Sequence, residues 1–344
     1  MFSLALRNAG VFLAVAVGGM VVQYLRGIIT PLVIALFLLM LIDGFDRAMA
    51  HRLPAVPGWL RSTLGVALTL TGFAVIVGIC AYDARSFVTQ IGVIAPKIDA
   101  LLAQVAGSFQ TPAPQVGDLF RVASSAASLT HVFGAARGFV SQAVLVVIYL
   151  GFLLASRQAF GIKVSKMFAS DAAREHGARV FTRVRSASEQ YVGIQTFKAA
   201  LVAATAFVIM RVIGLQDALF LALILFLAAY VPIVGGIAAA VLPTLIAFGE
   251  FDGPFKPLLL FAVLGGTIFI IENIVLPKLQ SERLNLDPVF ILLSLGFWGA
   301  LLGPAGALLS TPLTVVVMAV AAEFDGARWL AVLLSKDGEV ASRE

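Results

Sequence analysis

Glu272 is the only acidic residue that lies well inside a long apolar segment of this chain. An ionisable group at membrane depth is costly to keep there, so it is a functional candidate by default. Its carboxylate could bind a cation or carry a proton that is coupled to transport. The alternative is a residue near a helix end that forms an ion pair with Lys278 or Arg283 just downstream. The sequence leaves these two interpretations open.

Glycine and proline interrupt two apolar segments on either side of Glu272. Paired broken segments are the best sequence indication of a transporter binding site, because lipid cannot satisfy the backbone groups that a broken helix exposes. The alternative is close helix packing through small residues. Together with the Glu272 segment, the two breaks predict a substrate or ion pathway formed by Pro232, Gly235, Gly236, Pro243, Glu272, Asn273, Pro277, Gly303, Pro304, Gly306 and Pro312.

Two lysines are candidate charge partners for this pathway. Lys198 lies in an earlier apolar run, and Lys278 follows Glu272 closely. Lys198 could extend its ammonium group to the membrane surface, pair with Glu189 or Glu272, or contact an anionic substrate.

The motifs of several enzyme classes are absent from the sequence. The three histidines, His51, His131 and His176, lie outside the apolar runs, and no His-Glu-x-x-His pattern occurs, which argues against a zinc protease. No Gly-x-x-x-x-Gly-Lys-Ser/Thr loop occurs, so we expect no use of ATP. The single cysteine, Cys80, allows neither an internal disulfide nor a cysteine metal site. We therefore expect no enzyme activity, no metal and no other cofactor, and transport that is driven by a gradient or by another protein.

The composition indicates that lipid surrounds the chain. Of its 344 residues, 60% are hydrophobic and 12% are charged, against about 25% charged residues in a soluble domain. The net charge is +5, but the basic residues form no patch with interleaved aromatic residues, so nucleic acid is not an expected partner. We predict an all-α, polytopic integral membrane protein with membrane lipid as its first partner.

The apolar runs predict where the chain crosses the bilayer, because a spanning helix needs roughly 20 mainly apolar residues. Only Arg26 and Gly27 separate the first two runs, which predicts a tight helical hairpin. Several of the later runs are short for a full crossing. The candidate spans are 5–25, 28–43, 63–82, 138–156, 191–213, 216–231, 235–249, 257–276, 288–301 and 304–322.

The distribution of Lys and Arg predicts the orientation, because cytoplasmic loops carry an excess of both. The stretches that are dense in Lys and Arg place both termini on the cytoplasmic side of an inner membrane. One of them, 157–190, is expected to present a solvated face near anionic headgroups. The predicted layout is three N-terminal spans (1–83), an extracytoplasmic amphipathic helical arm (84–137), a fourth span (138–156), a basic cytoplasmic helical segment (157–190), a transport core with broken helices (191–325) and a cytoplasmic tail (326–344).

Several stretches of the second half of the chain form a recognisable pattern: Tyr191 to Gln195, Tyr230 to Gly236 with Pro243, Glu272 to Lys278, Leu284, Leu286, Pro288, and Gly303 to Pro312. This pattern resembles the autoinducer-2 exporter family. The order of hydrophobic segments is similar too, although a glycine region that often reads Pro-Tyr-Ile-Gly-Pro in the family is Pro-Ile-Val-Gly-Gly here.

This resemblance implies about eight transmembrane helices, with some late segments forming re-entrant hairpins. It also implies a homo-oligomer, for which a pentamer is one expectation. Members of the family are associated with export of a small signalling furanone, and others resemble monovalent cation/proton antiporters. The resemblance therefore implies transport but not the cargo.

Three functions remain open on the sequence. The first is gradient-driven export of a small polar organic solute, with the site between the two broken segments. The second is a sodium or lithium/proton antiporter, in which Glu272 is the shared carboxylate. The third is a membrane scaffold without transport activity, whose arm (84–137) binds partners.

Overall fold

The structure is a computed structural model, and it describes residues 17–78, 141–157, 159, 163, 171–231, 234–279, 286–324 and 326–338. The predicted arm (84–137) lies outside the described residues, as do Pro232 and Arg283. An isolated antiparallel bridge between Leu286 and Ser335 accompanies the helices. The helices are 17–24, α2 (Arg26–Arg52), Gly58–Gly78, Ser141–Arg157, α6 (Asp171–Ile213), α7 (Ala218–Ala228), α8 (Val234–Glu250), α9 (Phe255–Ile270), the π-helix η1 (Ile271–Val275), α10 (Leu276–Leu279), α11 (Pro288–Leu302), α12 (Pro304–Leu308), α13 (Ser310–Glu323) and α14 (Arg328–Leu334).

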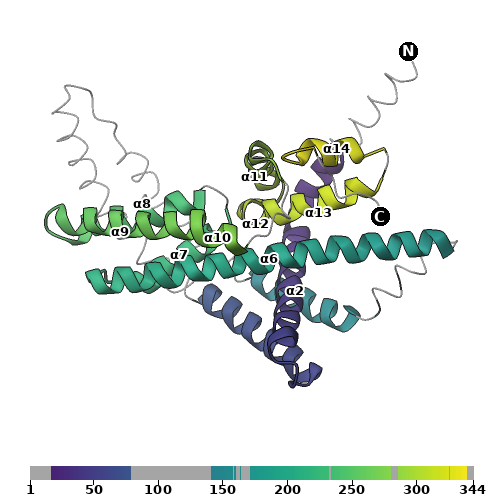
Figure 1. Ribbon diagram of the computed structural model, residues 1–344, viewed down its shortest axis with the longest axis horizontal. Coiled ribbons are helices and arrows are strands. Elements are labelled where there is room, and N and C mark those ends of the chain that lie inside the picture. Colours follow the sequence, from purple (N-terminus) through teal and green to yellow (C-terminus); the bar gives the residue numbers. More distant parts are fainter. Residues whose placement is uncertain are drawn as a thin grey trace, which may run out of the picture. The chain divides into compact units, whose positions relative to one another are not determined.

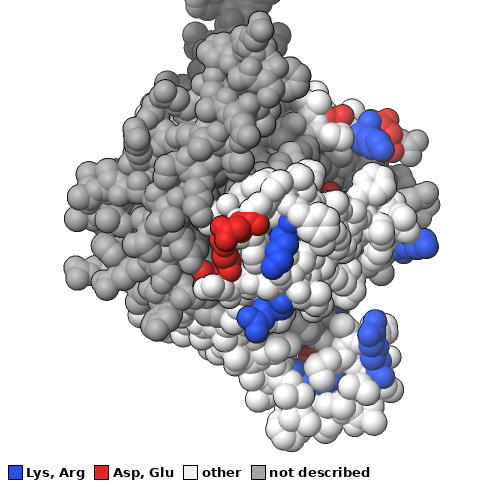
Figure 2. Space-filling model, turned by 90° about the vertical axis from the view of Figure 1, so that its left-hand side faces the viewer, with Lys and Arg blue, Asp and Glu red and all other residues white. Residues whose placement is uncertain are grey.

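Four described helices are long and apolar enough to cross a membrane. They are Arg26–Arg52, Gly58–Gly78, Gly177–Ile213 within α6, and Phe255–Lys278, which joins α9, η1 and α10. Their surfaces expose large apolar side chains, such as Phe255 at 76% and Phe269 at 63%. The described part of the surface in Figure 2 is mainly uncharged. These features belong to a multi-pass helical membrane protein, as the composition predicts.

The chain divides into two compact units that do not follow its order in sequence. Unit 2 comprises residues 67–143 and 194–281. Its described core forms where the C-terminal half of α6, α7, α8 and α9 pack together, and Figure 1 shows η1 and α10 continuing the line of α9. Fully buried Met210, Leu221, Leu225 and Leu260 lie in this core.

Unit 1 comprises residues 1–66, 144–193 and 282–344. In it α13 packs against both α11 and α14, and Leu286, Val315 and Leu334 form a buried apolar cluster. The Asp287 amide donates to the Leu334 carbonyl at 3.0 Å. The C-terminal segment, expected only as a tail, therefore contains a helix that packs onto the unit.

The predicted hairpin between the first two apolar runs is wrong. Leu25 has φ −88° and ψ 10°, close to helical values, and i→i−4 hydrogen bonds join Leu25 to Val21 and Ile29 to Leu25. A single residue with this geometry does not reverse a chain. Residues 17–24 therefore lead into α2 without turning back.

Two further boundaries differ from those that hydropathy predicts. The helix α2 continues to Arg52 although its apolar run stops at 43. Buried Pro31, Ala35, Leu38 and Ile42 recur at spacings of three and four along it, which places one face of the helix against the protein. The helix α6 is likewise continuous from 171 to 213, across the expected boundary between a basic segment and a span.

Candidate substrate site

The first predicted break is present in unit 2. The helix α7 ends at Ala228 and α8 begins at Val234. Local bonds satisfy part of the backbone between them, since Tyr230 N donates to Leu227 O at 3.1 Å and Gly235 N to Val231 O at 2.9 Å. A Cβ on Gly235 would lie 2.4 Å from the Ala228 carbonyl oxygen, so only glycine allows α8 to start this close to α7.

Polar side chains from α6 complete the hydrogen bonding at this break. The Gln195 amide donates to the Ala229 carbonyl at 2.7 Å, one of the carbonyls that lose their helical donor at a C-terminus. The Tyr230 hydroxyl donates to Thr196 Oγ1 at 2.7 Å. Gln195 and Tyr230 are 5% and 6% exposed. An interrupted helix in an apolar medium needs such internal partners, and sequence analysis did not predict that α6 supplies them.

Glu272 lies on the π-helix η1, inside the long helix Phe255–Lys278. Single π-turns within α-helices are frequent at functional sites. Its carboxylate oxygen Oε1 lies 3.5 Å from Lys198 Nζ, and the Lys198 and Glu272 side chains are 9% and 34% exposed. Of the partners considered for Lys198, the structure selects Glu272.

Gly236 lies directly against this carboxylate. A Cβ at Gly236 would lie 3.0 Å from each carboxylate oxygen of Glu272, tighter than an ordinary van der Waals contact. The backbone at the start of α8, where Gly236 has no side chain, therefore lies directly against the ion pair. The first break, the π-turn and Lys198 of α6 meet at one place in unit 2.

The other residues predicted near Glu272 have more local roles. The Asn273 amide donates to the Phe269 carbonyl of its own helix at 2.9 Å. Pro277 has no N–H, so the Asn273 carbonyl loses its usual donor four residues later. Lys278 is exposed, and the Glu272 carboxylate pairs with Lys198 instead. Pro243 lies inside α8 with its side chain fully buried.

The second predicted break is present in unit 1. The helix α11 ends at Leu302, Gly303 has φ +72°, and Pro304 begins the short helix α12. A Cβ at Gly306 would lie 2.1 Å from the Trp298 carbonyl oxygen, so this glycine allows α12 to pack closely on α11. Pro312 is buried in α13. At Gly306, as at Gly235, the geometry favours close packing through small residues.

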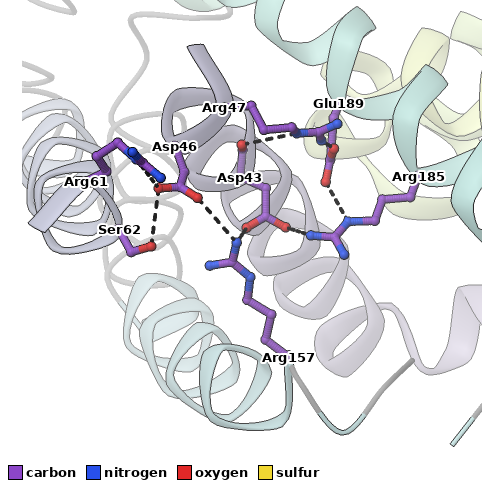
Figure 3. A network of polar contacts seen from close by, with 8 residues as sticks. All are labelled: Asp43, Asp46, Arg47, Arg61, Ser62, Arg157, Arg185 and Glu189. Atoms are coloured by element: carbon purple, nitrogen blue, oxygen red, sulfur yellow. Dashed lines mark hydrogen bonds and ion pairs between the residues drawn. The ribbon is translucent and has the colours of Figure 1, made fainter. Parts of the chain in front are cut away.

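An ionic cluster in unit 1 was not predicted. Asp43 forms an ion pair with Arg157, whose Nη2 lies 2.7 Å from Oδ1, and accepts a hydrogen bond from Arg185 at Oδ2. Arg185 Nε also donates to Glu189 Oε1 at 2.7 Å, and Arg47 pairs with the same carboxylate. Figure 3 shows these side chains converging from α2, α6 and the helix that ends at Arg157.

Asp46 extends this cluster toward the next helix. It accepts from Ser62 Oγ at 3.4 Å and lies 3.7 Å from Arg61 Nε. We call the seven charged residues the arginine–carboxylate cluster: Asp43, Asp46, Arg47, Arg61, Arg157, Arg185 and Glu189. The spacing of Arg185 and Glu189 by four residues was a sequence signal for part of it.

These groups define what chemistry the described residues offer. The site in unit 2 offers a carboxylate, an ammonium group, backbone and a few hydroxyl and amide groups. Among the described residues, no group of three or more His, Cys, Asp and Glu could hold a metal ion. The arrangement can bind and exchange a polar solute, a cation or a proton.

Apolar helices of membrane-spanning length, with an ion pair at an interrupted helix, are features of polytopic membrane transport proteins. The chain belongs to the AI-2E family of transporters, whose family model matches residues 11–325. The resemblance read from the sequence is confirmed, as is the expectation that the chain is a transporter rather than an enzyme.

The chain is also similar to curated bacterial proteins over most of its length. A "Putative transport protein" of Haemophilus influenzae is 29% identical over 310 residues, covering 84% of this chain and 85% of that protein. The "Putative transport protein YhhT" of Escherichia coli is 27% identical over 323 residues, covering 89% and 88%. The "AI-2 transport protein TqsA" of Escherichia coli is 24% identical over 331 residues, covering 91% of each.

Proposed function

We propose that this protein exports a small polar organic solute of the autoinducer-2 type, driven by a gradient, through a site centred on Lys198, Glu272 and Gly236. The observation that carries the proposal is the ion pair of Lys198 and Glu272 at 3.5 Å, beside the glycine that begins α8. The name of TqsA, which refers to AI-2 transport, supports this choice of cargo.

The ion pair suits a solute that carries both donors and acceptors. Charges in a poorly solvated site must be paired or hydrogen-bonded. A polyhydroxylated solute can donate to the Glu272 carboxylate and accept from the Lys198 ammonium group, so it replaces the ion pair without leaving either charge unsatisfied. Glu272, which is more exposed than Lys198, is the partner that we expect to take up a proton when export is coupled to a proton gradient.

The lengths of the helices support re-entrant hairpins. The helix α7 has 11 residues and rises about 16 Å, against a hydrocarbon core about 30 Å thick. We propose that α7 and α8 form one such hairpin and that α11 to α13 form another. The residues of the second break repeat the sequence pattern of the first break, so we keep them in the proposed pathway: Gly303, Pro304, Gly306 and Pro312.

A transport assay in proteoliposomes tests the proposal. Wild-type protein should accumulate labelled autoinducer-2 by counterflow, and Glu272→Gln should reduce the initial rate at least about tenfold, because the neutral amide cannot hold Lys198 or offer the solute a carboxylate. Glu175→Gln is the matched control, since Glu175 is an exposed carboxylate on α6. Equal rates for the wild type and Glu272→Gln would remove the proposed site.

A monovalent cation/proton antiporter is the second candidate, because a partly exposed carboxylate can exchange Na⁺ or Li⁺ for a proton. In the same vesicles, addition of NaCl or LiCl should then dequench a pH-sensitive dye in the wild type and not in Glu272→Gln. A dye response without solute counterflow would replace the exporter with the antiporter.

The setting of the protein in the cell follows the sequence and the family resemblance. We propose an inner-membrane location with both termini in the cytoplasm, and a homo-oligomeric assembly, with a pentamer as the expected size. Accessibility of tags at the two termini in intact and permeabilised cells tests the orientation. Mass photometry of the detergent-solubilised protein tests the assembly.

A further inference from the structure

A cavity of about 350 Å³ opens beside the arginine–carboxylate cluster of unit 1. It is lined by Asp43, Arg47, Arg157, Thr182, Arg185 and Ser186. Three guanidinium groups and one carboxylate thus form its charged wall, which gives the lining a formal charge of +2. A wall of this charge attracts an anion and repels a cation.

The carboxylates of the cluster are covered and its guanidinium groups are not. The side chains of Asp43 and Glu189 are 5% and 2% exposed. Those of Arg47, Arg157 and Arg185 are 49%, 28% and 40% exposed. A molecule that enters the cavity therefore meets cationic groups first, with the neutralising carboxylates behind them.

The donor geometry favours a phosphate group over a simple halide. Each guanidinium carries five N–H donors in a planar fork that matches two oxygens of a phosphate. Asp43, Asp46 and Glu189 together bring six carboxylate oxygens to three such forks, fewer than the N–H donors that the forks carry, so donor capacity remains for a ligand. The exposed Ser186 adds a hydroxyl group at the edge of the cavity.

We propose that this cavity is a binding site for a phosphate-type oxyanion, separate from the solute site. Two sources supply that chemistry, an anionic phospholipid headgroup and a soluble phosphate or phosphate ester. Both are compatible with the position of the cavity, because Arg157 is the last residue of its helix and α2 ends within three turns of Asp43. In the predicted orientation these helix ends lie at the cytoplasmic membrane surface.

The test measures binding directly on the full-length protein in a neutral detergent. Native mass spectrometry compares retention of phosphatidylglycerol with that of phosphatidylcholine, and equilibrium dialysis with radiolabelled inorganic phosphate at constant ionic strength measures the soluble source. Ser186→Asp adds a carboxylate at the cavity without removing any of the ion pairs. Ala178→Asp is the matched control, because it introduces the same charge at an exposed position two turns earlier on α6.

We expect the wild type and Ala178→Asp to bind one of the two probes, and Ser186→Asp to bind it about tenfold more weakly, because the new charge repels the ligand at close range. Selective loss of phosphatidylglycerol identifies a headgroup site, and selective loss of inorganic phosphate identifies a soluble ligand. Absence of binding in the wild type, or equal binding in the wild type and Ser186→Asp, would overturn the proposal. Thr182→Asp, also in the cavity wall, replaces Ser186→Asp if that variant does not fold.

Discussion

Each of the two units contains an ionic group, but the carboxylates in the two groups differ in burial and in the number of charged partners. In unit 1, Asp43 and Glu189 are each held by two arginines. In unit 2, Glu272 forms an ion pair with one described residue, Lys198, at the longer distance of 3.5 Å. A carboxylate held by two guanidinium groups is fixed in place, whereas one held by a single ammonium group can exchange that partner for a ligand. The comparison assigns a structural role to the buried carboxylates of the cluster and a transport role to the pair of Lys198 and Glu272.

The largest effect that we predict is on transport, at Gly236. A leucine there would push the Glu272 carboxylate away, since even a Cβ would lie 3.0 Å from both of its oxygens. We expect Gly236→Leu to lower the initial transport rate about a hundredfold. Gly266→Leu serves as the control, because no atom lies within 4 Å of a Cβ at that position of α9. Transport at the wild-type rate in Gly236→Leu would place the solute elsewhere.

The second prediction concerns stability and the cluster. Asp43→Asn removes the charge that two arginines share and should lower the free energy of unfolding by about 2–3 kcal/mol, less than for a fully buried pair because the arginines remain partly hydrated. Denaturation by increasing mole fraction of SDS, followed by circular dichroism, measures the change. Asp252→Asn, at an exposed turn, should be within about 0.5 kcal/mol of the wild type. A loss equal to that of the control would mean that the cluster is not structural.

The third prediction compares the coupling energies of the two ionic groups. A double-mutant cycle of Lys198→Met and Glu272→Gln should give a coupling of about 1 kcal/mol. The cycle of Arg157→Met and Asp43→Asn should give a larger coupling energy, since Arg157 Nη2 and Asp43 Oδ1 lie only 2.7 Å apart. The reverse order would contradict the contrast between a fixed cluster and an exchangeable pair. The initial transport rate of the first double variant should stay at least about tenfold below that of the wild type, even where its stability is close to that of the wild type.

The smallest predicted effect is at the first break. Tyr230→Phe removes the hydrogen bond to Thr196 and keeps the edge-to-face contact with Phe226, whose ring centre lies 5.6 Å away. We expect a loss of about 1 kcal/mol in stability, measured by the same SDS titration. Tyr24→Phe, at a side chain that is 88% exposed, should change nothing. If both variants behave alike, α6 does not hold the break through this bond.

The sequence predicted the class of fold and the two interruptions because composition and Gly/Pro spacing are local properties. Glu272 was found for the same reason, as a charge within an apolar run. Its partner was only one of several alternatives, because pairing of Lys198 with Glu272 depends on how α6 packs against η1. Nothing in the residue order near Glu272 predicted the π-turn.

The cluster was missed because hydropathy ended the second apolar run at Asp43. The helix α2 continues to Arg52 since charges on its extension find partners on other helices, and that is tertiary information. Asp43 and Arg47 are four residues apart, as are Arg185 and Glu189. These spacings were visible, but they indicated separate solvated pairs rather than one shared cluster. The helix α14, with 7 residues, is too short for a periodicity to stand out.

Water access to position 272 tests the central claim most directly. In a Cys80→Ser background, which removes the only natural cysteine, Glu272→Cys and Phe269→Cys are compared for reaction with a membrane-impermeant, hydrophilic thiol reagent in proteoliposomes. Both positions lie on the helix Phe255–Lys278. Phe269 is 63% exposed, and we expect it to face lipid, so we predict rapid labelling at 272 and almost none at 269. Equally slow labelling at the two positions would mean that no aqueous path reaches the ion pair, and would contradict the transport site proposed for this protein.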